Sequence, residues 1–281
     1  MNLRCEKRVL FMGERIEDVY HYGRLMNRPA KEPIQCIELE RTETFDGGIV
    51  AASAHARGFC ESMKFRSDRS VTKARWLESA HGRKLFSCYE GTETWETNYP
   101  WETMPPALRP NIIAVCDYGH GMMTPDLVAV TEAQPAFLAA CVQTNAGNYG
   151  FNLATKYHDL DYLCVDELEA RLATQNQAGD IKQSLAQLSS IADTVVVTLG
   201  KEGAIGWRSG EIVHVPAYTD RVRDTMGAGD AFFAVTALFA EELTLTDLLR
   251  LGNAAAAVKT QHMGQRAVTR AEVEAILDFA R

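Results

Sequence analysis

Seven consecutive residues late in the chain have the types and spacing that suit phosphate chemistry. Residues 224–230 read Asp-Thr-Met-Gly-Ala-Gly-Asp, and the apolar run 231–235 follows at once. Two glycines two residues apart allow a tight turn that brings backbone N–H groups close to a ligand, and a helix that begins near Asp230 adds its positive N-terminal end. The segment therefore predicts a cradle for a phosphate group.

Asp230 itself has two interpretations. A carboxylate is repelled by a phosphate site unless it has another task, and Asp is a common N-cap of helices. Alternatively, Asp230 orients a substrate hydroxyl and accepts its proton, while the N–H groups of Gly227, Ala228 and Gly229 steady the transferring phosphoryl group. The local residues leave both interpretations open.

The pattern Asp-Thr-x-Gly-Ala-Gly-Asp resembles the C-terminal signature of the PfkB, or ribokinase-like, carbohydrate kinases. The resemblance implies an α/β fold, a ribokinase-like three-layer α/β/α sandwich with a mostly parallel central sheet and a small β-lid. It also implies ATP as donor, Mg²⁺ at the nucleotide phosphates, and a sugar or sugar phosphate as acceptor. In this family Asp230 would be the catalytic base, and Gly227, Ala228 and Gly229 would form the anion hole.

Further matches to the family imply nucleotide-side residues. Residues 198–203 match Thr-x-Gly-x-x-Gly, and Asp166-x-x-Glu169 stands for Asn-x-x-Glu, with Glu169 near the metal. Acidic residues in the first turn of a helix also simply complement its dipole. An Asn followed by alanines resembles the adenine-side Asn, although such alanines otherwise indicate only tight helix packing. The implied nucleotide residues are Thr198, Gly200, Gly203, Asp224 and Asn253.

Acceptor-side residues are implied in the same way. Asp18 matches an early Asp that binds sugar hydroxyls, and Gly47 and Gly48 match a pair on which the sugar lies, although a plain turn explains them equally. Residues 72–75 and 83–86 resemble the heptose-phosphate kinase branch, the kinase half of the bifunctional ADP-heptose synthesis protein. There, cationic side chains would hold the substrate's phosphate, whereas solvated charge on an edge strand is the other explanation. The acceptor-side residues are Asp18, Gly47, Gly48, Lys73, Arg75 and Asp117, the last just beyond a predicted parallel strand.

The chain departs from the family at several points. The Asn expected after the glycine pair and an Asp-Pro-Lys after residue 142 are absent, and His120 stands where a Lys is expected. After residue 60 the sequence predicts that roughly one βα unit of the family is absent, since the polar segment 61–70 reads as a loop that leads directly to Val71. These departures motivate two alternatives: a catalytically degenerate regulator or complex partner, and a kinase for a nucleoside or another alcohol.

The elements that must position these residues follow from hydrophobic patterning. Apolar runs rich in β-branched residues predict buried strands, a Ser-Gly turn predicts a hairpin, and partial alternation predicts a half-exposed strand at 33–41. The predicted buried strands are 9–13, 112–117, 137–142, 160–165 and 194–200, the hairpin is 204–207 with 212–215, and the helices are 49–57, 181–191, 248–259, one near Asp230 and one capped by Thr269 and Glu272.

Composition limits the remaining possibilities. A chain of 281 residues with 46% hydrophobic content predicts one domain, 1–281, with lid segments at about 15–46 and 70–100. A net charge of −8 and a pI near 5.4 argue against nucleic acid as a partner. We expect no membrane span or signal peptide, and seven scattered cysteines favour reduced thiols in the cytoplasm. Lids of this family often pair two subunits, so the resemblance allows a homodimer.

Overall fold

The computed structural model describes residues 2–61, 63–66, 70–91, 104–219, 221–262, 264 and 266–279. Within these residues, eight strands form a central sheet in the order β12-β11-β10-β9-β8-β7-β1-β4. Neighbours from β4 to β10 are parallel, and the hairpin β10-β11-β12 is antiparallel. The strands are β1 (Val9–Gly13), β4 (Met63–Arg66), β7 (Ile112–Asp117), β8 (Phe137–Val142), β9 (Leu160–Asp166), β10 (Ala192–Thr198), β11 (Ala204–Arg208) and β12 (Glu211–Val215).

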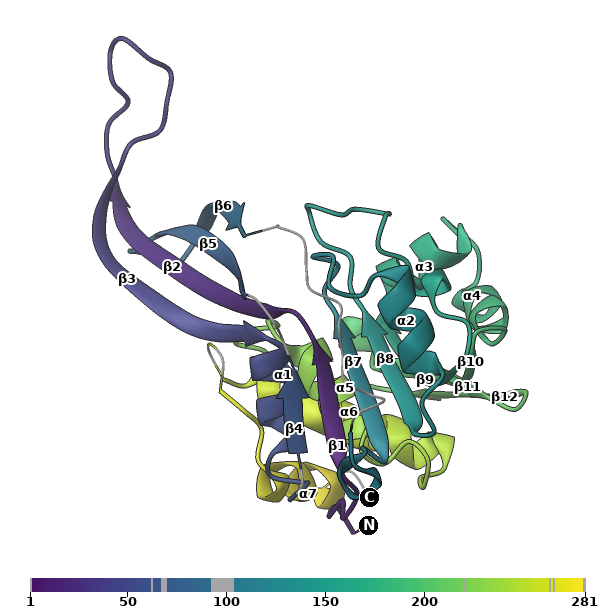
Figure 1. The fold of residues 1–281 in the computed structure, drawn as a ribbon. Coiled ribbons are helices and arrows are strands. Elements are labelled where there is room, and N and C mark those ends of the chain that lie inside the picture. The colour runs from purple at the N-terminus through teal and green to yellow at the C-terminus, as the bar shows by residue number, and fades with distance from the viewer. Residues whose placement is uncertain are drawn as a thin grey trace.

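Helices cover both faces of this sheet (Figure 1). In β1, Val9 and Phe11 belong to one hydrophobic cluster, whereas Leu10 and Met12 belong to the other, because successive side chains of a strand point to opposite faces. One face packs against α1 (Ile49–Ala56), α5 (Ala228–Thr236), α6 (Leu245–Thr260) and α7 (Arg270–Phe279), and the other against α2 (Pro125–Glu132), α3 (Glu167–Thr174) and α4 (Ile181–Leu188). The predicted three-layer sandwich is confirmed.

A smaller four-stranded sheet extends from one edge of the molecule (Figure 1). Its order is β3-β2-β5-β6, and β2 follows β1 after the single residue Glu14. The strands are β2 (Arg15–Leu25), β3 (Ile37–Gly48), β5 (Ser70–Glu78) and β6 (Lys84–Glu90). The lid segments were expected at about 15–46 and 70–100; β3 continues to Gly48, and residues 92–100 fall outside the described part of the chain.

The shortened connection after Cys60 has a definite form. Residues 61–70 were expected to be a loop, but 63–66 form β4, which pairs in parallel with β1 at the edge of the sheet. Only three residues separate Arg66 from Ser70, and an α-helix needs more residues than that to close its first hydrogen bond. The strand of the βα unit is therefore present, and the connection from Arg66 to Ser70 is too short for its helix.

Two smaller details complete the fold. The predicted strand 33–41 begins only at Ile37, whereas α6 begins three residues earlier than predicted because the Thr244 side chain accepts a hydrogen bond from the Asp247 N–H. Short 3-10 turns lie at Pro106–Leu108, Ala154–Lys156 and Gly200–Glu202. Among the described residues, none of the helices has the length and apolar character needed to cross a bilayer.

Candidate active site

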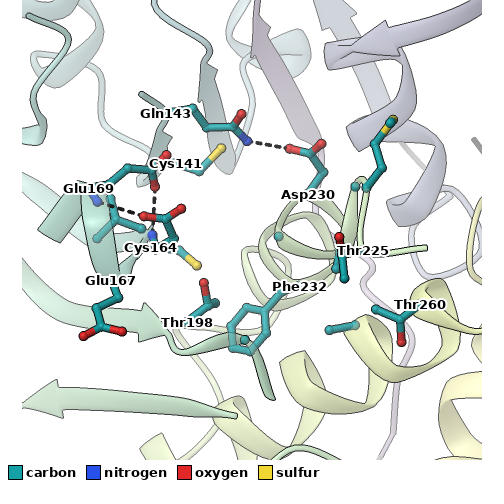
Figure 2. A pocket seen from close by; sticks show the side chains of 18 of the residues that line it. Cys141, Gln143, Cys164, Glu167, Glu169, Thr198, Thr225, Asp230, Phe232 and Thr260 are labelled. Atoms are coloured by element: carbon teal, nitrogen blue, oxygen red, sulfur yellow. Dashed lines mark hydrogen bonds between the residues drawn. The ribbon is translucent and has the colours of Figure 1, made fainter. Parts of the chain in front are cut away.

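A cavity of about 1220 Å³ lies where the carboxyl ends of the parallel strands meet the small sheet and the start of α5. Figure 2 shows Cys141, Cys164, Glu169, Thr198 and Asp230 around it, contributed by five different elements. The sequence-predicted residues that line the cavity are Asp18, Gly48, Lys73, Arg75, Glu169, Thr198, Gly200, Gly203, Gly227, Ala228, Gly229, Asp230 and Asn253. Gly47, Asp117 and Asp224 are not among the lining residues.

The start of α5 is built by Gly227. Its φ of +73° is a left-handed conformation that glycine adopts without strain, and the helix begins at Ala228. The Ala228 N–H donates to the Thr225 carbonyl at 3.2 Å, and Gly227, Ala228 and Gly229 line the cavity at the N-terminus of the helix, where the first N–H groups have no intrahelical acceptor. The cap interpretation of Asp230 is wrong, because the N-cap is Gly227 and Asp230 lies within the first turn.

Two hydrogen bonds fix the Asp230 carboxylate. Its Oδ1 atom accepts from the Tyr118 hydroxyl at 3.1 Å and from Gln143 Nε2 at 2.9 Å, and Figure 2 shows the second bond. Burial raises the pKa of Asp230 to about 6, these two donors oppose that increase, and the nearby Asp18 carboxylate adds to it. Asp230 is therefore mostly ionised at neutral pH and can accept a proton. Sequence reasoning did not assign a role to Tyr118 or Gln143, although both follow predicted parallel strands directly.

On the acceptor side, Asp18 of β2 and Arg75 of β5 form an ion pair whose side chains are 7% and 10% exposed. The Arg75 guanidinium also lies 5.2 Å from the centre of the Tyr20 ring. A Cβ atom at Gly47 would lie 2.6 Å from Asp18 Oδ2, and one at Gly48 would lie 2.3 Å from a backbone oxygen. The glycine pair thus leaves room for the Asp18 carboxylate and for the turn into α1.

Lys73 and His120 lie at the same end of the site. Lys73 lines the cavity, and its Nζ atom is 4.9 Å from the centre of the Tyr89 ring. The His120 ring, in the loop after β7, lies 6.0 Å from the Tyr89 ring, measured between the ring centres. Burial, and then the Lys73 charge, lower the pKa of His120, so the imidazole is neutral at pH 7 and does not replace the charge of the expected Lys.

Asp117 lies in the protein interior, with no exposed surface, rather than in the cavity. Lys156 Nζ lies 2.5 Å from its carboxylate, and the Tyr157 hydroxyl donates to it at 2.9 Å. Beside it, the fully buried Glu14 accepts N–H bonds from Tyr118, His120 and Met122 at 2.9, 3.1 and 3.2 Å. These two carboxylates fix the loop 117–122, and burial together with Asp117 raises the pKa of Glu14 to about 7.

The turn between β10 and β11 forms the far end of the cavity, where Thr198, Gly200 and Gly203 line it. Gly203 has a φ of +92°, and a Cβ atom there would lie 2.1 Å from the Val215 carbonyl oxygen. Asn253 also reaches the cavity, but its Nδ2 group donates to Val215 O at 2.9 Å and Pro216 O at 3.1 Å. Its amide donor therefore ties α6 to the end of β12.

Asp224 stabilises from behind the segment 224–230, which we call the phosphate loop after the chemistry that its sequence predicts. Its Oδ1 atom accepts the Met226 N–H at 3.0 Å, and Oδ2 accepts the Gly264 N–H at 3.2 Å. The buried Lys259 ammonium donates to the Gly264 carbonyl at 2.9 Å. The structure thus connects the phosphate loop to the segment after α6 and does not place Asp224 on the cavity wall.

Glu169 combines both interpretations of its position. It forms a capping box with Asp166 at the start of α3, and its other oxygen accepts the Thr144 N–H at 2.9 Å. Burial, with repulsion from Asp166, raises its pKa to about 8. In the part of the chain that the structure describes, no group of three or more His, Cys, Asp or Glu side chains could hold a metal alone. In the ionised form, which a bound cation favours, each Glu169 oxygen keeps a second lone pair, so the residue fits Mg²⁺ that is held mainly by nucleotide phosphates.

Comparisons with known proteins agree with this geometry. Residues 153–271 match the model of the pfkB family carbohydrate kinases. The bifunctional protein HldE of Bradyrhizobium sp. (strain ORS 278) is 26% identical over 94% of this chain and 62% of its own length, and that of Geobacter sulfurreducens is 32% identical over 60% and 35%. The chain thus spans less than two thirds of these relatives.

Solved structures extend the likeness over nearly the whole chain. A ribokinase from Thermotoga maritima superposes with a TM-score of 0.75 at 16% identity, covering 97% of this chain and 99% of its own. Arabidopsis thaliana ribokinase, in complex with ribose and ATP, gives a TM-score of 0.75 at 18% identity over 98% and 99%. The chain therefore carries a PfkB-family match in residues 153–271 and has the ribokinase-like fold, as its motifs predicted.

Proposed function

We propose that this protein is an ATP-dependent phosphotransferase that phosphorylates a hydroxyl group of a sugar or sugar phosphate. The observation that carries the proposal is the Asp230 carboxylate, which faces the cavity directly beside the N–H groups at the start of α5. A general base within reach of an anion-binding helix terminus is the arrangement that phosphoryl transfer to an alcohol requires.

In the proposed reaction Asp230 accepts the proton of the acceptor hydroxyl as its oxygen attacks the γ-phosphorus of ATP. The new O–P bond forms as the bond to the β-phosphate oxygen breaks, and ADP leaves. The N–H groups of Gly227 and Gly229, together with the positive end of α5, stabilise the charge on the transferring group. Because these donors belong to a helix, they need little reorganisation during the reaction.

The nucleotide would lie along the far half of the cavity. The turn with Thr198, Gly200 and Gly203 offers a hydroxyl and close-approaching backbone to its phosphates. Glu169 would help the nucleotide phosphates to hold Mg²⁺, and the metal when bound would neutralise part of the phosphate charge. Asn253 would shape the end of the cavity that receives the nucleobase, because its amide donates to the backbone at the end of β12 rather than to the nucleobase.

The acceptor would lie against the small sheet, between Asp18 and Asp230. The likeness to the HldE proteins favours a phosphorylated heptose, and Lys73 is the cation we assign to its phosphate. Arg75 has a different task in this proposal, because it already neutralises the buried Asp18 carboxylate. Asp18 would accept hydrogen bonds from sugar hydroxyls, for which a carboxylate has four lone-pair positions.

The experiment is turnover by the wild-type protein and by the variant Asp230→Asn. With Mg-ATP and a panel of heptose 7-phosphate, other sugar phosphates, free sugars and nucleosides, we expect ADP release with a sugar or sugar phosphate. Asp230→Asn should lose about 10²- to 10⁴-fold in kcat, because that is the usual contribution of a general base. The control is Asp126→Asn, in the first turn of α2 and remote from the cavity, which should retain activity.

Three results would replace this proposal. No turnover with any acceptor would favour the non-catalytic regulator or complex partner. ADP release with nucleosides alone would favour a kinase of a different alcohol. A fully active Asp230→Asn variant would remove Asp230 from the role of base, whatever the acceptor.

A further inference from the structure

Both donors to Asp230 bind the same carboxylate oxygen. Tyr118 and Gln143 donate to Oδ1, whereas no hydrogen-bond partner of Oδ2 occurs among the described residues. The two donors come from neighbouring strands, since Tyr118 follows the last residue of β7 and Gln143 the last residue of β8, and those last residues are register partners. The carboxylate is therefore held on one side and open on the other.

We propose that Tyr118 and Gln143 are positioning residues that hold Oδ1 of Asp230, so that Oδ2 is the atom that accepts the proton of the acceptor hydroxyl. This inference rests on the proposed phosphotransferase function. It assigns a task to two side chains that lie outside both the phosphate loop and the turn 198–203. It also specifies which carboxylate oxygen faces the substrate.

The loop around Tyr118 is itself held firmly in place. The Tyr118 N–H donates to Glu14 Oε2 at 2.9 Å, and the Tyr118 carbonyl accepts from Asn145 Nδ2 at 2.7 Å. Burial raises the pKa of the Tyr118 hydroxyl well above its ordinary value, so the group remains a donor throughout the physiological pH range. A rigid donor restricts rotation of the carboxylate that it binds, which keeps Oδ2 at a constant position.

Gln143 is fixed in a similar way. Its backbone N–H donates to the Asp117 carbonyl at 2.8 Å, and its own carbonyl accepts from Asn152 Nδ2 at 3.1 Å. The side-chain amide then spans from the end of β8 to α5 (Figure 2). An amide carries no charge, so it can bind the carboxylate without competing for the proton during turnover.

The two donors also favour the charged form of Asp230 against the effect of burial. The titratable groups that act on this carboxylate from the elements around it are Asp18, Tyr118, Cys141, Cys164, Glu169 and Lys259. Burial raises the pKa values of both thiols, so they are uncharged near neutrality. Asp18 is paired with Arg75, and the buried Lys259 favours ionisation of Asp230. Tyr118 and Gln143 are thus the direct hydrogen-bond donors that keep the base ionised.

The proton balance of the step is simple. Oδ2 receives the proton as the acceptor oxygen bonds to phosphorus, and Oδ1 becomes the carbonyl-like oxygen of a carboxylic acid. This oxygen can still accept both hydrogen bonds, although more weakly. After the product leaves, the proton passes from Oδ2 to solvent through the open cavity, which returns the carboxylate to its starting form.

The test compares Tyr118→Phe and Gln143→Met, which remove one donor each at nearly constant side-chain volume. Losing a hydrogen bond to a charged group raises its pKa by about 1 to 2. We expect the acidic limb of kcat/KM to move from about 6 to about 7 or 8, a loss of up to about tenfold at pH 7, and recovery at pH 9. The matched control is Tyr162→Phe, which removes a buried hydroxyl bonded to Thr236 Oγ1 at 2.9 Å outside the cavity and should not move this limb.

A second measurement keeps the inference separate from the proposed function. Carbon-13 NMR of labelled Asp carboxyls, assigned with Asp230→Asn, should show the Asp230 pKa rising in both donor variants even if no acceptor is known. An equal loss of activity at every pH with an unmoved carboxyl titration would overturn the inference, because a merely structural role predicts that result. Absence of turnover by the wild-type protein, in contrast, would overturn the proposed function alone.

Discussion

The Asp18–Arg75 pair allows a sharp test of what Arg75 does, and the perturbation is Arg75→Met. Both side chains are at most 10% exposed, so removing the guanidinium deletes one side of a buried ion pair. Breaking a buried pair from one side costs about 3 to 5 kcal/mol in the free energy of unfolding. Lys73→Met, which removes a cation from the same strand, should cost less than about 1 kcal/mol, because Lys73 contacts an aromatic ring rather than a buried carboxylate among the described residues.

The assay is urea unfolding at pH 7.5 of the wild type, Arg75→Met, Asp18→Asn and the double variant. If the pair is structural, the double variant should be more stable than the sum of the single effects predicts, with a coupling energy of about 1 to 3 kcal/mol. The reasoning would be refuted by an Arg75→Met variant within about 1 kcal/mol of wild type, or by additive single effects. A large rise in KM for phosphorylated acceptors without loss of stability would instead assign Arg75 to the substrate's phosphate.

Two further predictions concern the contact of α1 with the segment after α6 and the turn 198–203. His55 is buried, its Nδ1 atom accepts the Val268 N–H, and burial followed by the Lys259 charge lowers its pKa to about 4. In the unfolded chain this imidazole binds a proton near pH 6.5, so the free energy of unfolding should fall by up to about 3 kcal/mol as the pH decreases from 6.5 to 4. The variant His55→Asn should reduce this dependence of stability on pH, which urea unfolding at several pH values can measure. Gly203→Ala should lower thermal stability and ATP affinity more than Gly210→Ala does. Both positions have a positive φ, but only at Gly203 would a Cβ atom lie 2.1 Å from a backbone oxygen. Differential scanning calorimetry and nucleotide titration measure the two effects.

The fold was predictable because each central strand is a continuous run of the sequence with a strong hydrophobic pattern. Runs such as 112–117 and 194–197 are buried on both faces and contain β-branched residues, so the sequence identifies them without tertiary information. The strand 63–66 was not predicted, because it is short, lies at the sheet edge and is surrounded by polar residues. Its pairing with β1 depends on a contact between distant segments that no local pattern encodes.

The site was predictable only where a motif carries its own geometry. The phosphate loop and the turn 198–203 need glycine at fixed positions, and those glycines are visible in the sequence. Asp117 and Asp224 matched motifs equally well, but the structure uses both to hold loops through hydrogen bonds. Glu14 gave no signal, because its three backbone donors belong to residues more than a hundred positions away.

The position of the shortened connection bears on whether the protein is active. Among the described residues, β4 stands at the end of the strand order and pairs with β1. The contacts that fix Asp230 come instead from the ends of β7 and β8 in the middle of the sheet. The short connection between β4 and β5 therefore changes the route into the small sheet, and the hydrogen bonds of Asp230 are retained. For the proposed kinase, the departures from the PfkB pattern thus favour a change in acceptor over a loss of catalysis.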